Sequence, residues 1–227
     1  SALGNPAVCR NRMEMLRLND DVAPRDAGGP AIYQCAPNFS AGRDLAVVEA
    51  LAAAMRRTPG CLLIDYSADP DHNRCVLTIL GAAPAVRAAV LAAAHVAVGR
   101  IDLRAHTGVH PRIGALDVVP VVPIRAATRE QAAALAETIG RALATELALP
   151  IYFYEDNARP GRAGALPLLR QGGFEAIRDR DLDADRLPDL GPARAHPSAG
   201  ATVVGARGPL IAYNVCLGTP DIAAARE

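Results

Sequence analysis

From Ala31 onward, apolar residues recur with the regular spacings of secondary structure. The stretch "AIYQCAP" predicts a first strand that ends at Pro37. "CLLIDYS" from Cys61 and "RCVLTIL" from Arg74 predict two further strands, joined by the turn "DPDHN" into a hairpin. Between the first strand and this hairpin, four apolar residues at helical spacing predict a helix that ends before Pro59: Leu45, Val48, Ala52 and Met55.

The alternation of helix and strand continues after the hairpin. Pro84 suits the first turn of a second helix, which ends near Gly99. "ALDVVPVVPI" predicts an edge strand, because its prolines cannot donate hydrogen bonds to ladders on both sides. Thr128 and Gln131 form a capping box that begins a third helix, and "IYFY" from Ile151 predicts the next strand.

The order of the first six elements, β-α-β-β-α-β, is the split βαβ plan of ferredoxin-like folds. The sequence therefore predicts an α+β sandwich, in which helices pack on one face of a single sheet. Residues 1–30 are polar and are interpreted as an N-terminal extension. The segment from Asn157 to Ser198 is rich in Pro, Gly and Arg, which is typical of a disordered loop or of a binding surface.

Composition limits the possible chemistry. The 24 basic residues balance 24 acidic ones, so we expect no general attraction to nucleic acid or to a membrane surface. All 24 basic residues are arginine, which excludes a lysine Schiff base and a Walker-type phosphate lysine. His, Asp, Glu, Cys and hydroxyl groups remain for catalysis, with arginine to bind anions.

Five widely spaced cysteines without a CxxC pair are typical of a reduced cytoplasmic protein. Cys35, Cys61 and Cys75 lie in apolar runs and are predicted to be small core residues. No apolar run approaches the ~18 to 20 residues of a membrane span. A short apolar core typical of a signal peptide is also lacking at the N-terminus, so we expect a soluble, cytoplasmic protein.

The stretch "HTGVHPRIGALDVVP" is the main candidate for chemistry. Its two histidines, His106 and His110, have the spacing of a helical metal pair, but Gly108 and Pro111 argue against a helix, so no metal site is predicted. His110 lies between a glycine, which allows close approach of the backbone, and the stiff dipeptide Pro-Arg. An imidazole beside a guanidinium suits proton transfer next to a bound carboxylate. The other three histidines are interpreted as surface or structural residues: His72, His95 and His196.

Four motifs together resemble the N-terminal subdomain of glutamate formiminotransferase, the folate enzyme that is fused in animals to a cyclodeaminase. They are "CAPNFSAGRD" (35–44), "TPGCLLIDYSADPDHNR" (58–74), "HTGVHPRIGALDVVP" (106–120) and "GPARAHPSAGATVVGAR" (191–207). The resemblance runs from about Ile32 to Asn214 in the order of the family, and "HPR.GALDV" is its most specific element.

The resemblance implies transfer of a formimino group from N-formimino-L-glutamate to N5 of tetrahydrofolate, a co-substrate, in one-carbon metabolism and histidine degradation. The catalytic histidine of the family falls on His110, with Arg112 beside it. The family's "NFS.G" turn and neighbouring substrate or folate contacts fall on Asn38, Phe39, Ser40, Gly42, Asp65, Ser67, Asn73 and Arg74. Its folate-contacting loop falls on Gly191, Pro192, Ala193, Arg194, Ala195, His196, Pro197, Ser198, Ala199 and Gly200.

Two residues differ from the family pattern. Ser67 stands where the family has a catalytically important aspartate, so Asp65 or Asp69 would have to supply the negative charge. Ala199 replaces a tryptophan of the folate loop.

The resemblance also implies a second, similar subdomain, with folate between the two. We therefore expect residues 31–199 to form the N-terminal subdomain and residues 200–227 to begin the next one. "ATVVGARGPLIAYNV" is then a strand without neighbours, which predicts a homo-oligomer or a partner chain. The alternative is a non-catalytic folate-binding or assembly protein of the same fold.

Overall fold

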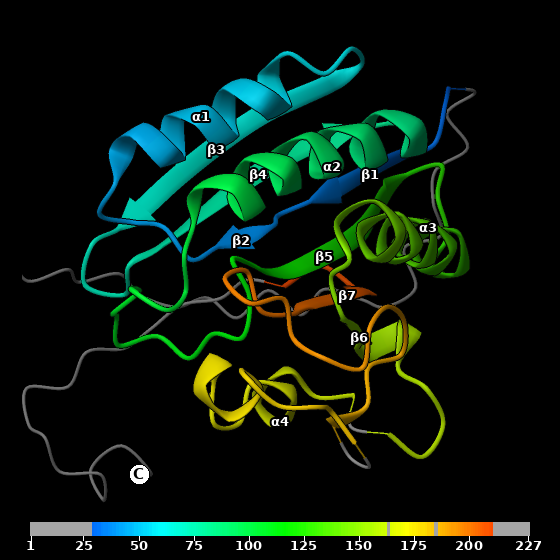
Figure 1. The fold of residues 1–227 in the computed structure, drawn as a ribbon. Coiled ribbons are helices and arrows are strands. Elements are labelled where there is room, and N and C mark those ends of the chain that lie inside the picture. The colour runs from blue at the N-terminus through cyan, green and yellow to red at the C-terminus, as the bar shows by residue number, and fades with distance from the viewer. Residues whose placement is uncertain (1–28, 163, 184–185, 211–227) are drawn as a thin grey trace, which may run out of the picture.

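Three long helices cover one face of a mixed sheet in this computed structural model, which describes residues 29–162, 164–183 and 186–210 (Figure 1). The helices are α1 (Leu45–Arg56), α2 (Ala83–Arg100) and α3 (Arg129–Leu147). The strands are β1 (Ile32–Cys35), β2 (Asn38–Phe39), β3 (Cys61–Asp69), β4 (Arg74–Gly81), β5 (Leu116–Arg125), β6 (Ile151–Phe153) and β7 (Thr202–Ala206).

The spatial order of the strands confirms the ferredoxin-like plan. β1 and β2 are two pieces of one strand position, because both pair with β4 on one side and with β5 on the other. β3 pairs with the outer edge of β4, and all pairings within this part are antiparallel. β7 and β6 extend the sheet beyond β5 by parallel pairing.

The helices begin where the sequence predicts, and the caps show why. The Asp44 carboxylate accepts hydrogen bonds from the backbone N–H groups of Ala46 and Val47, which begins α1. Thr128 and Gln131 form the expected capping box of α3. One apolar core joins the three helices to the covered face of the sheet. Of the three cysteines predicted to be core residues, Cys35 and Cys75 are buried in it, whereas Cys61 is only partly buried against it.

β5 is a central strand, so the prediction of an edge strand was wrong. Each of its two prolines lies at an interruption of one flanking ladder only, because Pro120 still pairs with Gly205 of β7 and Pro123 with Tyr33 of β1. β1 pairs with residues 121–125 and β2 with residues 116–118, and Pro120 lies between these two pairings. Pro123 lies beyond Val121, the last residue of β5 that pairs with β7. The missing N–H groups therefore cost this strand little.

The expectation of an unpaired strand after residue 200 was also wrong. β7 lies between β5 and β6 and pairs with both, in the same sheet as the rest of the fold. Its five residues are all buried. Residues 211–227 of the expected second subdomain, and residues 1–28 of the expected extension, lie outside the described residues.

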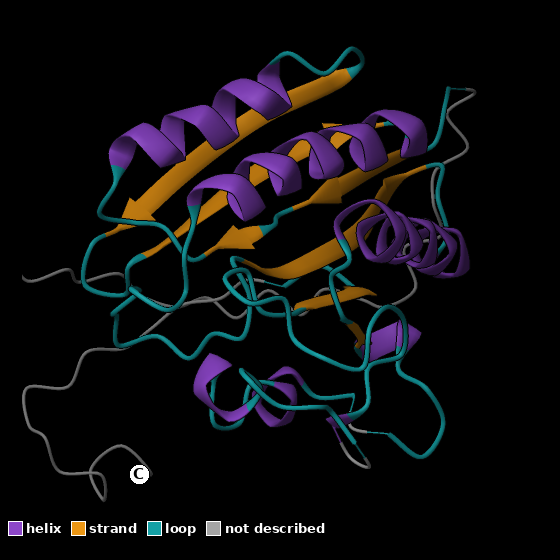
Figure 2. Cartoon of the chain, in the orientation of Figure 1, coloured by secondary structure: helices purple, strands orange, loops and turns teal. Residues whose placement is uncertain are grey.

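The described residues between Asn157 and Ser198 pack along one end of the sheet, mostly as loops (Figure 2). The segment begins at the last residue of η1 (Glu155–Asn157) and contains α4 (Leu166–Leu169) and η2 (Phe174–Ala176). Phe174, Ile177 and Leu182 are buried against the core. The described parts of this segment are thus anchored by apolar side chains, and they bring polar residues to the site described below.

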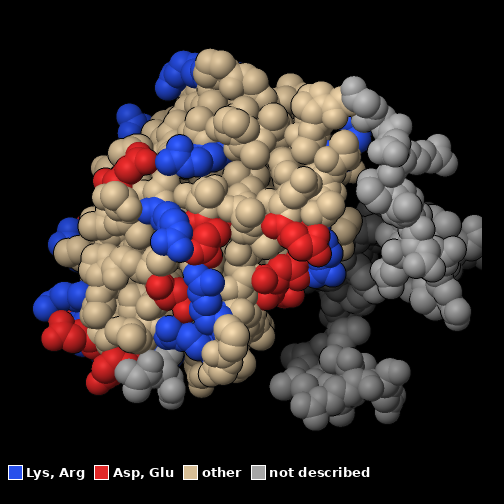
Figure 3. Space-filling view, turned by 90° about the vertical axis from the view of Figure 1, so that its right-hand side faces the viewer, with Lys and Arg blue, Asp and Glu red and all other residues tan. Residues whose placement is uncertain are grey.

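Acidic and basic side chains are interspersed on the face that includes α3 (Figure 3). Several form ion pairs, such as Arg129 with Asp156 and Arg141 with Glu137. This face therefore carries no large patch of a single charge. Among the described helices, none combines the length and apolarity that crossing a membrane would require.

Candidate functional site

The loop that carries the two central histidines packs against the turn between β3 and β4. Two glycines make this approach possible. A Cβ atom on Gly108 would lie 2.4 Å from the carbonyl oxygen of His72, and one on Gly42 would lie 2.2 Å from the carbonyl oxygen of Asp69. Real Cβ atoms do not come this close, so both positions require glycine. The close approach expected at Gly108 is confirmed.

Asn73 ties together the three loops of this region. Its Oδ1 accepts hydrogen bonds from the backbone N–H groups of Gly42 (2.9 Å) and Arg43 (3.1 Å). Its Nδ2 donates to the carbonyl oxygen of Thr107 at 3.0 Å. Its φ of 47° is one that asparagine tolerates better than most residues. The sequence predicted a substrate contact here, whereas the amide bonds to neighbouring loops.

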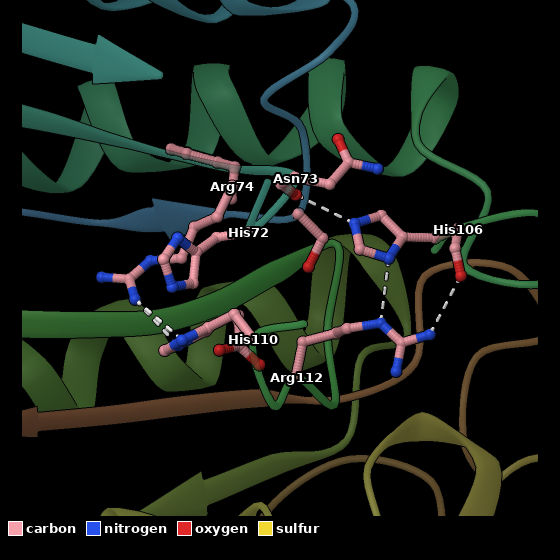
Figure 4. A pocket seen from close by; sticks show the side chains of 9 residues that line it. His72, Asn73, Arg74, His106, His110 and Arg112 are labelled. Atoms are coloured by element: carbon pink, nitrogen blue, oxygen red, sulfur yellow. Dashed lines mark hydrogen bonds between the residues drawn. The ribbon is translucent and has the colours of Figure 1, made fainter. Parts of the chain in front are cut away.

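His106 is held on both sides of its ring (Figure 4). Its Nε2 lies 2.9 Å from the carbonyl oxygen of Asn73, which can only accept, so Nε2 carries the proton. Its Nδ1 accepts a hydrogen bond from Nε of Arg112 at 3.0 Å. Both ring nitrogens are occupied in the neutral tautomer, so His106 supports the loop and has no free lone pair.

His110 contacts a different arginine. A guanidinium nitrogen of Arg74, at the start of β4, lies 2.8 Å from Nε2 of His110 (Figure 4). Arginine has only donors, so Nε2 of His110 must be the acceptor and Nδ1 carries the proton. The ring of His72 meets that of His110 edge-on, with centroids 5.7 Å apart. The side chain of His110 is half-buried and borders open space.

Burial and positive neighbours lower the pKa of His110 to about 4. Desolvation is the largest cause, followed by the charges of Arg74, Arg170 and His72, while Asp69 acts in the opposite direction. His110 is therefore neutral near pH 7 in the free protein, with its proton on Nδ1 and the lone pair of Nε2 directed at Arg74.

We expect the free energy of unfolding to fall as the pH is lowered from about 6.5 to about 4. The unfolded chain takes up a proton on His110 near its ordinary pKa of about 6.5, whereas the folded chain does so only near pH 4. Between these values the unfolded state binds more protons, so acid favours unfolding. Urea unfolding at pH 7 and pH 4.5 measures the difference.

The matched control is His110→Gln, which should lose less stability over the same interval. Burial also lowers the pKa values of His106 and His196, and their contribution is common to both proteins. An equal loss in wild type and variant would contradict the assignment to His110.

The guanidinium of Arg112 points away from His110. It donates to the carbonyl oxygen of His106 at 3.2 Å, in addition to the ring contact, and to both carboxylate oxygens of Glu175 at 2.8 and 2.9 Å. The sequence placed Arg112 beside His110 as a cationic partner. In the structure Arg74 contacts His110, and Arg112 joins the loop to η2.

A buried ion pair between Asp117 and Arg170 lies near His110. Asp117 on β5 accepts a hydrogen bond from Arg170, which follows α4. The other carboxylate oxygen of Asp117 accepts from the backbone N–H groups of Ile113 (2.8 Å) and Gly114 (3.2 Å). This pair fixes the end of the histidine loop to the start of β5.

His110 borders two recesses. The inner one is a tight cleft lined by Phe39, Ser40, His72, Asn73, Arg74, His106, His110, Arg112 and Asp117. The outer one is an open cavity of about 630 Å³ lined by Ser67, Ala68, Asp69, His72, Arg74, Val76 and His110. Its volume lies in the range of small-molecule sites. The β4 residues that line it alternate with Cys75 and Leu77 of the core, so it opens on the sheet face opposite the helices.

The structure brings some of the predicted residues together and leaves others apart. Phe39, Ser40, Ser67, Asn73 and Arg74 line the recesses beside His110. Outside these linings are Asn38, Gly42, Asp65 and the loop Gly191–Gly200.

The loop Gly191–Gly200 packs elsewhere. Its Ser198 carbonyl accepts from Leu103 N–H, and its Ala199 carbonyl accepts from Ala115 N–H. His196 accepts hydrogen bonds on Nδ1 from the backbone of Ser198 and Ala199, so it stabilises the turn.

Asp117, Arg170 and Glu175 were not recognised in the sequence as site residues. Asp117 had a signal, because a lone acidic residue in the apolar run "ALDVVP" needs a buried partner. Arg170 and Glu175 lie in an irregular segment and carried no signal. Within the described residues, no group of three or more His, Cys, Asp or Glu side chains could hold a metal ion.

Comparison with known proteins identifies the family of the chain. Residues 32–207 match the family described as formiminotransferase domain, N-terminal subdomain. Glutamate formimidoyltransferase of Streptococcus pyogenes serotype M1 is 42% identical over 192 residues, which are 84% of this chain and 64% of that protein. Formimidoyltransferase-cyclodeaminase of Rattus norvegicus is 42% identical over 186 residues, which are 82% of this chain and 34% of that protein.

A more distant relative is glutamate formimidoyltransferase of Thermoplasma acidophilum, 37% identical over 199 residues, which are 85% of this chain and 64% of that protein. The chain thus spans less than two thirds of the length of each of these relatives. The match to the family covers most of the chain, including the histidine loop and the seven strands that the structure describes. The chain therefore belongs to the formiminotransferase family and corresponds to its N-terminal subdomain.

Proposed function

We propose that this chain takes part in the transfer of a formimino group from N-formimino-L-glutamate to N5 of tetrahydrofolate. The observation that carries the proposal is a neutral imidazole, His110, at the edge of a cavity of about 630 Å³, in a chain whose relatives are named glutamate formimidoyltransferases.

The reaction needs a proton carrier more than an activated electrophile, because the formimino carbon is already cationic. N5 of tetrahydrofolate forms a bond to this carbon, and the bond between the carbon and the glutamate nitrogen then breaks. One proton leaves N5 and one proton reaches the departing glutamate nitrogen. We assign both transfers to His110, which accepts the first proton and returns it.

The charged groups around the cavity suit these substrates. Arg74 is a cation for a substrate carboxylate. Asp69 lines the same cavity, and hydrogen bonds from the backbone and side chain of His72 lower the pKa of its carboxyl group. We assign to Asp69 the negative charge that the family's aspartate would provide at the position of Ser67.

We further propose that a second body completes the folate site, either a second subdomain or another copy of this chain. The cavity is open, and apolar side chains are exposed elsewhere in the sheet, at Leu62 and Ile64 of β3 and at Ile124 of β5. The exposed loop residues Pro192, Ala193 and Arg194 remain our candidates for contact with folate.

A transfer assay tests the proposal. With tetrahydrofolate and N-formimino-L-glutamate, we expect one glutamate released for each 5-formimino-tetrahydrofolate formed. Folic acid is the control, because its N5 carries no hydrogen and cannot make the product. Light scattering on the same samples reports whether active protein is an oligomer. Folate binding without transfer would favour a binding protein, and glutamate release without folate would contradict a transferase.

A further inference from the structure

Arg74 has no carboxylate partner among the described residues, unlike Arg112 and Arg170. Arg112 is paired with Glu175 and Arg170 with Asp117. Within the part of the chain that the structure describes, the side-chain hydrogen bonds of Arg74 all go to the ring of His110. Its Nε is buried without any acceptor in the described structure. The guanidinium of Arg74 thus has N–H donors without an acceptor, and its main hydrogen-bond partner is the neutral ring of His110.

This contact occupies the atom that His110 needs for proton transfer. The guanidinium donates to Nε2 at 2.8 Å, so the lone pair of that nitrogen is engaged. A base cannot accept a proton at an atom whose lone pair is already used. In the free protein the proposed proton carrier is therefore blocked by its own neighbour.

An anion in the open cavity would reach Arg74 directly. Arg74 and His110 both line this cavity, beside Ser67 and Val76. Guanidinium binds a carboxylate through two charge-assisted hydrogen bonds, which are roughly twice as strong as bonds between neutral groups. A carboxylate therefore outcompetes the neutral imidazole for Arg74.

We propose that Arg74 is a positioning residue that engages the lone pair of His110 in the free protein and releases it when a substrate carboxylate binds in the cavity. This inference rests on the proposed function and adds a coupling between substrate binding and the readiness of the base. The protein would thus hold His110 inactive until an anionic substrate is present.

The other charged groups near His110 are already paired with one another, His72 with Asp69 and Arg170 with Asp117. His72 and Asp69 face it from the turn between β3 and β4, and Arg170 from the segment after α4. The carboxylate of Asp117 on β5 acts electrostatically on Arg74. Only Arg74 both touches His110 and lacks a carboxylate, so a bound anion acts mainly through it.

The test is the titration of His110 followed by NMR of the imidazole nitrogens, with glutarate as the dicarboxylate probe. In wild type we expect the Nδ1–H tautomer and protonation only at low pH. Saturating glutarate should raise the pKa of His110 by roughly one unit or more, as removal of a neighbouring charge does. In Arg74→Gln the pKa should already be raised, and glutarate should have no further effect.

Arg43→Gln is the matched control. Arg43 lies near the site and donates to the Pro70 carbonyl and to Thr107, but makes no contact with His110. It should keep the response to glutarate. An unchanged His110 titration in Arg74→Gln, or a glutarate response that persists in it, would overturn the inference.

This readout needs no turnover, so it separates the inference from the proposed function. A chain that transfers formimino groups while its His110 ignores glutarate would disprove only the coupling. A chain with the coupling but no transfer would disprove only the reaction.

Discussion

His110→Ala should lower kcat for formimino transfer by a factor of about 100 or more, the usual contribution of a general acid–base residue. The free energy of unfolding at pH 7 should change little, because the ring is half-buried and, within the described part of the chain, hydrogen-bonds only to Arg74. Steady-state kinetics and urea unfolding measure the two effects separately.

His106→Ala provides the contrast. This ring bonds to the Asn73 carbonyl and to Nε of Arg112, so its loss should reduce stability more and kcat less. Equal losses of kcat in both variants at unchanged stability would contradict the separate roles. If added zinc also increased wild-type activity, a metal site between the two histidines would be favoured instead.

Asp117→Ala should lower the free energy of unfolding by about 3–5 kcal/mol, the typical cost of removing one partner from a buried ion pair. Both side chains of the pair are nearly inaccessible, with exposed fractions of 3% for Asp117 and 11% for Arg170. The variant leaves a buried guanidinium without its carboxylate, and the N–H groups of Ile113 and Gly114 lose their acceptor. Urea unfolding at pH 7 measures the effect.

Two further variants sharpen this test. Glu175→Ala removes a carboxylate that is 54% exposed, and such pairs contribute about 1 kcal/mol or less. Arg170→Met combined with Asp117→Ala should recover part of the loss, because no charge is then left unpaired. A loss below about 1 kcal/mol in Asp117→Ala would mean that the pair is not buried as described.

The periodicity of the sequence predicted most of the fold, because each helix and strand is specified by local residues. The capping box at Thr128 and the turn between β3 and β4 are examples. The position of β5 in the sheet could not be predicted in this way. Prolines exclude a strand from two intact ladders, but here the ladder with β1 and β2 is interrupted at Pro120, and the ladder with β7 ends before Pro123. Where these ladders break or end is decided by the neighbouring strands and cannot be read from the residues of β5.

The site was predictable only in part for the same reason. His110 stood out through its neighbours in the chain, and the resemblance to the family identified it independently. Its actual partner, Arg74, is 36 residues away, and Arg170 is 53 residues from Asp117. No spacing rule connects such pairs. Arg112 was expected to act beside His110 because they are close in sequence, but the loop turns its guanidinium towards His106.

The parallel insertion of β7 has a consequence for the order of folding. β1 to β5 can complete their antiparallel pairing without it, whereas β6 pairs in the sheet only with β7 among the described strands. A ribosome releases the chain from its N-terminus, so the ferredoxin-like part can form first. The edge of β5 that pairs with β7, and the whole of β6, then stay unpaired until residues 154–201 have been synthesised. During this interval the nascent chain exposes strand edges that other chains could join.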